Sequence, residues 1–262
     1  MGIVNVTPDS FSDGGSFLAA DDAIAHGLQV AQDGAAVLDV GGESTRPGAE
    51  PVAAEEELRR VLPVVRELAS SAGVPVSIDT TKAAVAHAAL EAGAAIVNDV
   101  SGGTADTGML RVAADAGALF IAMHMRGTPR TMRQEAVYDD VVGEVASELR
   151  RRVEHAIDAG VDSGAILADP GIGFAKDGAQ NLALLRALPE IAVRVGVPLV
   201  VGTSRKSFLA KIAGDELLAR DDATLATSVW CFERGVAMVR VHDVRSSRRA
   251  ALLLDALEEA AA

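Results

Sequence analysis

Residues 75–99 read PVSIDTTKAAVAHAALEAGAAIVND, which is one strand–helix–strand unit. The runs PVSID (75–79) and AIVND (95–99) are short and mostly apolar until a polar residue ends each of them. Residues 81–92 between them have the composition of a helix, and the glycine in EAGAAI supplies the left-handed residue that commonly follows a helix. Two strands joined through a helix in this way lie parallel, with a right-handed crossover.

The same unit repeats along the whole chain. Further strands are predicted at 2–6, 36–40, 118–124, 165–169, 198–202 and 237–242. Helices are predicted near 21–33, 55–71, 105–116, 135–159, 179–195, 205–213 with 221–234, and 244–260. Eight such units without a Pro- or Ser-rich linker predict an α/β fold, a single (β/α)8 TIM-barrel domain over residues 1–262. A doubly wound open sheet is the alternative, but no GxGxxG follows the first strand.

Nearly every predicted strand ends on a polar or charged residue, although packing gives an apolar strand no reason to do so. These ends are Asn5, Asp39, Asp79, Asn98, His124, Asp169 and Arg240, and Lys206 follows one further strand. In a closed parallel barrel the carboxyl ends of the strands converge on one face, where catalytic residues lie. Two long polar loops, 7–18 and 41–54, belong to the same predicted face, which indicates function rather than simple connection.

Composition excludes several classes of protein. The net charge of −13 argues against nucleic acid as a partner, which would need clustered Lys and Arg. No stretch reaches the ~20 apolar residues of a membrane span, and the first residues lack the features of a signal peptide. The single Cys231 excludes an internal disulfide and a cysteine metal cluster. We therefore expect a cytoplasmic protein.

Three of the strand ends suggest a heterocycle as ligand. Asp79, Asn98 and Asp169 would point into one mouth, where a carboxylate pairs with two N–H donors and an amide both donates and accepts. A ring with a guanidine-like edge, such as a pterin or guanine, fits this set, and Lys206 would donate to a ring carbonyl or nitrogen. Any one of these residues alone could instead be a structural hydrogen bonder.

The last and first strands suggest a phosphate site. Arg240 and His242 are two residues apart and so face the same side of the last strand. With Asn5 on the neighbouring first strand they form a corner suited to a diphosphate, where Asn5 would ligate Mg²⁺ beside phosphate oxygens. The alternative for His242 is a histidine satisfied within the core.

The sequence SRKSFL suggests an anion site at the start of a helix. Ser204 is expected to cap this helix, and its free N–H groups, with Ser207, would bind a carboxylate. His124 ends the fifth strand, but a lone histidine is more often structural, so no chemistry is assigned to it.

Taken in order, eight segments resemble one enzyme family. They are NVTPDSFSDGG, DVGGESTRPGA, SIDT, NDVSGG, MHMRGTPRTMR, DPGIGFAK, GTSRKSF and RVHDV. Together they are similar to the dihydropteroate synthase family of bacterial folate biosynthesis over nearly the full chain. The resemblance implies a (β/α)8 barrel, usually homodimeric, that joins 6-hydroxymethyl-7,8-dihydropterin diphosphate to 4-aminobenzoate with Mg²⁺ and releases diphosphate. It also implies inhibition by sulfonamides, which mimic 4-aminobenzoate.

The resemblance assigns three subsites. The pterin pocket would consist of Asp79, Asn98, Met123, Asp169 and Lys206. The diphosphate site would consist of Asn5, Thr45, Arg240 and His242, with Asn5 as the metal ligand. The 4-aminobenzoate site would consist of Phe11, Arg46, Pro47, Phe174, Lys206 and Ser207. Asp79, Lys206, Arg240 and His242 are the residues expected to be catalytic.

Two other functions remain possible on the sequence. A methyltetrahydrofolate:corrinoid methyltransferase would keep the Asp/Asn pterin set but has no use for Lys206, Ser207 or the Arg240–His242 corner. A non-catalytic paralogue that binds pterin or a protein is the other. Late helices that include Trp230, Cys231 and Phe232 are expected to form the homodimer, with burial in the same barrel as the alternative. Family members usually have a short segment before the first strand, so a start placed too late, or a trimmed chain, would explain why Met1 directly precedes it here.

Overall fold

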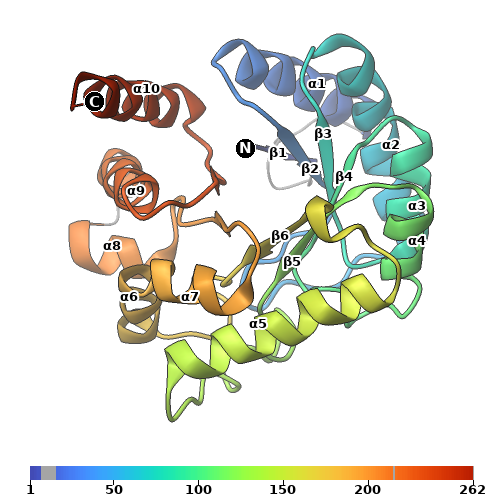
Figure 1. Ribbon diagram of the computed structural model, residues 1–262. Coiled ribbons are helices and arrows are strands. Elements are labelled where there is room, and N and C mark those ends of the chain that lie inside the picture. The colour runs from blue at the N-terminus through green and yellow to red at the C-terminus, as the bar shows by residue number, and fades with distance from the viewer. Residues whose placement is uncertain (7–15, 215, 262) are drawn as a thin grey trace.

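The computed structural model describes residues 1–6, 16–214 and 216–261, and in them eight parallel strands alternate with helices (Figure 1). The strands are β1 (Gly2–Asn5), β2 (Leu38–Gly41), β3 (Val76–Asp79), β4 (Ile96–Asp99), β5 (Leu119–Met123), β6 (Ile166–Asp169), β7 (Val200–Val201) and β8 (Met238–Val239). The helices are α1 (Ser16–Gln32), α2 (Ala54–Ser71), α3 (Ala83–Glu91), α4 (Met109–Asp115), α5 (Val141–Asp158), α6 (Gly178–Arg186), α7 (Leu188–Val195), α8 (Ser207–Ala213), α9 (Leu217–Phe232) and α10 (Val244–Ala261). The predicted TIM-barrel fold is confirmed.

The strands form a barrel that closes at two narrow seams. Strands β1 to β6 pair in sequence order, and β7 pairs with β8. Single bridges join the two sheets: Ala168 pairs with Leu199, and Gly2 pairs with Val241. The amide of Ile3 donates to the carbonyl of Val241 at 3.1 Å across the second seam. The first and last strands are therefore neighbours, as the diphosphate-site prediction required.

The barrel interior is apolar at one end and polar at the other. Side chains alternate along a strand, so Ile96 and Asn98 of β4 point to the same side. Met1, Val37, Ile96, Ile121 and Val200 form a buried apolar cluster of their own. Asp39 lies two residues beyond Val37 and Asn98 lies two residues beyond Ile96, so these polar side chains are on the same side of their strands and nearer the carboxyl end. The larger core fills the space between the sheet and the surrounding helices, with Leu38, Phe120 and Leu184 among its buried residues.

Several predicted helices differ from the observed ones: the helix predicted at 135–159 begins at Val141, and the helix predicted at 105–116 begins at Met109. Two further differences lie closer to the site. The predicted helix 179–195 is two helices, because Pro189 lacks an amide donor and so fits only the first turn of a new helix, α7. The predicted helix 205–213 begins at Ser207, and its N-cap is Lys206 without a side-chain cap bond. Ser204 is therefore too far from the helix to cap it, contrary to prediction.

Glycines end several helices as the sequence indicated. Gly34 after α1 and Gly160 after α5 have φ values of 96° and 101°, a region that residues with a Cβ rarely adopt. Of the helices described, none is long and apolar enough to span a membrane.

Candidate functional site

A buried ion-pair network joins β2, the carboxyl ends of β3 and β4, and the residue directly after β8. Arg240, directly after β8, donates from Nε to Asp39 Oδ2 at 2.6 Å and from Nη2 to Asp79 Oδ2 at 2.8 Å. Asn98 donates from Nδ2 to the same Asp39 oxygen at 3.1 Å, while Asp39 Oδ1 has no hydrogen-bond partner among the residues described. Asp39 is fully buried, so it organises the network rather than contacting a ligand. The sequence identified Asp39 as a strand end, but no role was assigned to it.

The network has unusual proton affinities. Burial raises the pKa of Asp79 to about 7, although the charge of Arg240 opposes this. Burial also acts against the charge of Arg240, but Asp39 and Asp79 outweigh it and raise the pKa of Arg240. The guanidinium of Arg240 therefore stays charged, whereas the Asp79 carboxyl group beside it changes between its protonated and ionised forms near neutral pH. Perturbed groups of this kind are concentrated at functional sites.

Asp169 and Lys206 lie in the same mouth. Asp169 ends β6 opposite Met123 of β5, and its Oδ1 accepts from the amide of Gly171 at 2.7 Å. Burial lowers the pKa of Lys206 to about 8, against the pull of Asp169 and Asp79. The carboxyl groups of Asp169 and Asp79 both act on the pKa of Lys206, so the three side chains lie near one another. The structure thus brings Asp79, Asn98, Asp169 and Lys206 together, with Met123 buried beside Asp169.

Phe174 and Lys206 form the adjoining wall. The Nζ atom of Lys206 lies 4.0 Å from the centre of the Phe174 ring, a cation–π contact. A Cβ at Gly173 would lie 2.9 Å from Lys206 Cδ, so only glycine lets the loop after β6 approach this closely. Ser207 follows at the exposed first position of α8.

The predicted diphosphate corner is less basic than expected. The Nδ1 atom of His242 is 2.9 Å from Ser204 Oγ, and burial, with the charge of Arg205 nearby, lowers the pKa of His242 to about 3. Its imidazole is therefore neutral. The Arg240 guanidinium is directed to Asp39 and Asp79, so its role at a diphosphate stays a prediction.

The loop 41–54 is anchored at the rim of the mouth. The amide of Gly48 donates to the carbonyl of Pro129 at 2.9 Å, which joins this loop to the one after β5. Arg46 and Pro47 are exposed and Thr45 is half-buried. The charge of Arg46 contributes to lowering the pKa of His242, so the two residues are near each other. Phe11 lies outside the described residues.

The residues at the end of β1 fit a magnesium ion held jointly with a substrate. Asn5 is half-buried there and pairs in register with Gly41 of β2. Among residues 1–6, 16–214 and 216–261, no group of three or more His, Cys, Asp or Glu side chains is arranged to hold a metal. Magnesium commonly takes one or two protein oxygens and completes its shell with phosphates and water. The Asn5 amide oxygen suits that arrangement.

Comparison with known proteins identifies the family. Residues 1–242 match the family described as pterin binding enzyme. The dihydropteroate synthase of Mycobacterium leprae is 51% identical over 254 residues, which cover 94% of this chain and 89% of that protein. The Xanthomonas albilineans dihydropteroate synthase with 4-aminobenzoic acid has a TM-score of 0.92 and 43% identity, covering 98% of this chain and 92% of the other. The Yersinia pestis enzyme with a sulfonamide drug has a TM-score of 0.91 and 39% identity, covering 98% and 93%. The chain therefore belongs to the pterin-binding enzymes, in the dihydropteroate synthase family.

Proposed function

We propose that the protein is a dihydropteroate synthase, a transferase that condenses 6-hydroxymethyl-7,8-dihydropterin diphosphate with 4-aminobenzoate to give 7,8-dihydropteroate and diphosphate. The main support is the buried Asp39–Arg240–Asp79 network with Asn98, next to Asp169 and Lys206, because it offers carboxylate, amide and ammonium groups to one heterocycle. The named relatives favour this activity over corrinoid methyl transfer. A single buried Cys231 suits a reducing compartment, so we propose that the enzyme works in the cytoplasm.

The pterin-binding residues also suit the reaction. The amine nitrogen of 4-aminobenzoate attacks the exocyclic methylene carbon of the pterin, the carbon–oxygen bond to the diphosphate breaks, and the amine loses a proton. An arylamine is a weak nucleophile, so positive charge must build on the pterin first. Ionised Asp79 and Asp169 would stabilise that charge, and their burial makes each interaction stronger than it would be in water.

The leaving group would depart towards β1 and β8. His242 can donate from Nε2 to a phosphate oxygen, because its Nδ1 is occupied by Ser204. Mg²⁺, when bound, would neutralise charge on the diphosphate, and Asn5 would hold it there. Lys206 would donate to the pterin ring. No covalent intermediate on a side chain is needed, and the site described contains no Ser–His–Asp or Cys–His arrangement.

The decisive test is turnover. The purified protein should release diphosphate from the pterin diphosphate only when both 4-aminobenzoate and Mg²⁺ are present, and dihydropteroate should form in equal amount. A paralogue without activity would bind pterin and release nothing. Methyl transfer from methyltetrahydrofolate to a corrinoid, without diphosphate release, would support the alternative enzyme.

His242→Ala should weaken binding of the pterin diphosphate and leave binding of free hydroxymethylpterin unchanged. Although the imidazole is neutral, its phosphate acceptor is charged, so the lost hydrogen bond should cost roughly 1.5–3 kcal/mol, a loss of about 10- to 150-fold in affinity. Calorimetry with both ligands measures this difference. Equal losses for the two ligands would show that His242 is not at the diphosphate.

Sulfamethoxazole should inhibit competitively with 4-aminobenzoate, and only when the pterin site is filled. Resistance needs a steric element that rejects the sulfonyl group but admits the smaller carboxylate. The loop sequence STRPGAEPV has no inserted residue beside Arg46 and Pro47, and Phe174 lies against Lys206. Inhibition kinetics at varied 4-aminobenzoate test this. Normal turnover with no inhibition would mean that Phe11, Arg46 and Pro47 are wrongly assigned.

We also propose a homodimer formed through α9 and α10, which pack against each other. Of the residues named from the sequence, Cys231 is buried and Phe232 packs on the core of its own barrel, whereas Trp230 is 41% exposed. The same two helices carry five exposed leucines: Leu217, Leu218, Leu252, Leu253 and Leu257. Light scattering should give twice the 26.9 kDa of one chain, and Leu253→Glu should give the monomer. A wild-type monomer at micromolar concentration would refute the dimer.

A further inference from the structure

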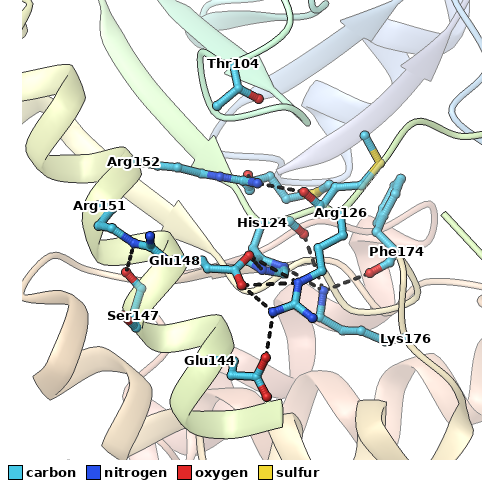
Figure 2. Close-up of polar contacts among 12 residues, drawn as sticks. Thr104, His124, Arg126, Glu144, Ser147, Glu148, Arg151, Arg152, Phe174 and Lys176 are labelled. Atoms are coloured by element: carbon cyan, nitrogen blue, oxygen red, sulfur yellow. Dashed lines mark hydrogen bonds and ion pairs between the residues drawn. The ribbon is translucent and has the colours of Figure 1, made fainter. Parts of the chain in front are cut away.

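A buried lysine, Lys176, lies in the loop after β6 and reaches His124 at the end of β5 (Figure 2). The Nζ atom of Lys176 is 2.8 Å from the carbonyl oxygen of Phe174, 3.0 Å from Nδ1 of His124 and 3.4 Å from the carbonyl oxygen of His124. Burial lowers the pKa of Lys176 well below its usual range. Both the ammonium and the neutral amine have an N–H group for each of the two shorter contacts. Lys176 therefore ties the loop to β5 in either state.

The acceptor for Lys176 is fixed by a chain of contacts from α5. His124 is fully buried, and burial, with the charge of Lys176, lowers its pKa to about 3, so its ring carries a single proton. The Nε2 atom is 3.0 Å from Glu148 Oε2, and a carboxylate needs a donor there. Glu148 is in turn held by Arg126, as Figure 2 shows. The proton is thus on Nε2, which leaves Nδ1 to accept from Lys176.

The loop that Lys176 ties down is a tight turn in an unfavourable conformation. Ala175, between Phe174 and Lys176, has a φ of 49°, which a residue with a Cβ adopts only when its surroundings hold it there. A Cβ at Gly171 would lie 1.9 Å from the carbonyl oxygen of His124, so the turn rests directly on the end of β5. Gly171 at one end of the turn and Lys176 at the other therefore both contact His124.

We propose that Lys176 is a positioning residue: by holding the 171–176 turn on His124, it sets the Phe174 ring and, through it, Lys206 for binding of 4-aminobenzoate. The ring of Phe174 lies on Lys206 Nζ at 4.0 Å, and the Lys206 stem passes over Gly173. A small shift of the turn would displace both groups. Lys176 itself would not touch the substrate. This inference rests on the proposed function, because that function makes the Phe174–Lys206 wall a binding surface.

Lys176→Met tests the proposal, with Lys211→Met on the exposed surface of α8 as the matched control. Lys176→Met should raise KM for 4-aminobenzoate about tenfold. KM for the pterin diphosphate should rise by a clearly smaller factor, because Lys206 also donates to the pterin ring whereas Phe174 belongs to the 4-aminobenzoate site alone. The control should change neither. In a Phe174→Leu background the Lys176→Met effect should largely vanish, because the group through which Lys176 acts is gone. Equal rises in both KM values, or full additivity with Phe174→Leu, would overturn the proposal.

Two further measurements apply if Lys176→Met does not fold or if the wild type shows no turnover. If Lys176→Met does not fold, Lys176→Gln keeps an N–H donor and should give a smaller KM change of the same kind, again absent in the Phe174→Leu background. Hydrogen exchange needs no turnover: the bonded amides of Gly171, Gly173 and Phe174 should exchange about tenfold faster in Lys176→Met or Lys176→Gln than in the wild type or the control. Unchanged exchange rates in the 171–176 turn would refute the inference about Lys176, whether or not the wild type makes dihydropteroate. Absence of dihydropteroate synthesis by the wild type would refute only the proposed function.

Discussion

Asp79→Asn is expected to lower kcat by about 100-fold or more, while the melting temperature falls by less than about 5 °C. Asparagine has the same shape, and Arg240 keeps Asp39 as its counter-charge. Because burial already raises the pKa of Asp79 to about 7, removing its charge costs the folded resting state little at neutral pH. The charge is needed only when the pterin becomes cationic. A turnover assay and a thermal melt of the same preparation measure both effects.

Asp99→Asn is the matched control, since Asp99 is a buried carboxylate one residue beyond Asn98. Its oxygens accept from the amides of Ser101 and Gly103 at 2.7 and 2.8 Å, so it supports a turn and does not belong to the ion-pair network. This variant should lose stability and keep most of its kcat. If Asp79→Asn instead turned over at a near-normal rate, Asp79 would have no part in the mechanism.

Arg240→Ala is expected to lower the free energy of unfolding by about 3–5 kcal/mol, the usual cost of leaving buried charges without their partner. It removes the cation that faces both Asp39 and Asp79, and Asp39 would keep only the amide of Asn98. Asp79 contributes to the pterin pocket, so free hydroxymethylpterin should bind more weakly as well as the diphosphate. The sequence assigned Arg240 to the diphosphate site, and that assignment implies a loss confined to the diphosphate substrate. Chemical denaturation and calorimetry measure the two effects.

An exposed arginine provides the comparison. Arg245→Ala breaks a surface pair with Asp33 and should leave both the unfolding curve and pterin binding unchanged. Adding Asp39→Asn to Arg240→Ala should recover part of the lost stability, because the unpaired Asp39 carboxylate is then removed, while Asp79, whose pKa burial raises to about 7 even beside Arg240, can take up a proton. If Arg240→Ala were as stable as the wild type and lost only diphosphate binding, Arg240 would belong to the diphosphate site, as the sequence indicated, and would not be needed to hold Asp39 and Asp79.

The eight strands and the grouping of their polar ends followed from local pattern. Runs of apolar residues with a polar last residue predict strands, and parallel strands in a barrel must bring those ends to one face. Asp79, Asn98 and Asp169 therefore came together as expected. Helix ends were harder, because they depend on single residues. Pro189 starts a new helix, and α8 begins at Ser207 and not near Ser204.

Partners and protonation depended on the tertiary structure. Arg240 and Asp39 are 201 residues apart in the chain, so no local pattern could show that the guanidinium pairs with this carboxylate. The neutral state of His242 and the contact of Lys176 with His124 likewise depend on burial and on groups from distant elements. The periodicity of a sequence records which way a side chain faces within its own element. The charged groups that surround a side chain, and their effect on its pKa, depend on distances between elements that are far apart in the sequence. Those distances are set only when the barrel closes.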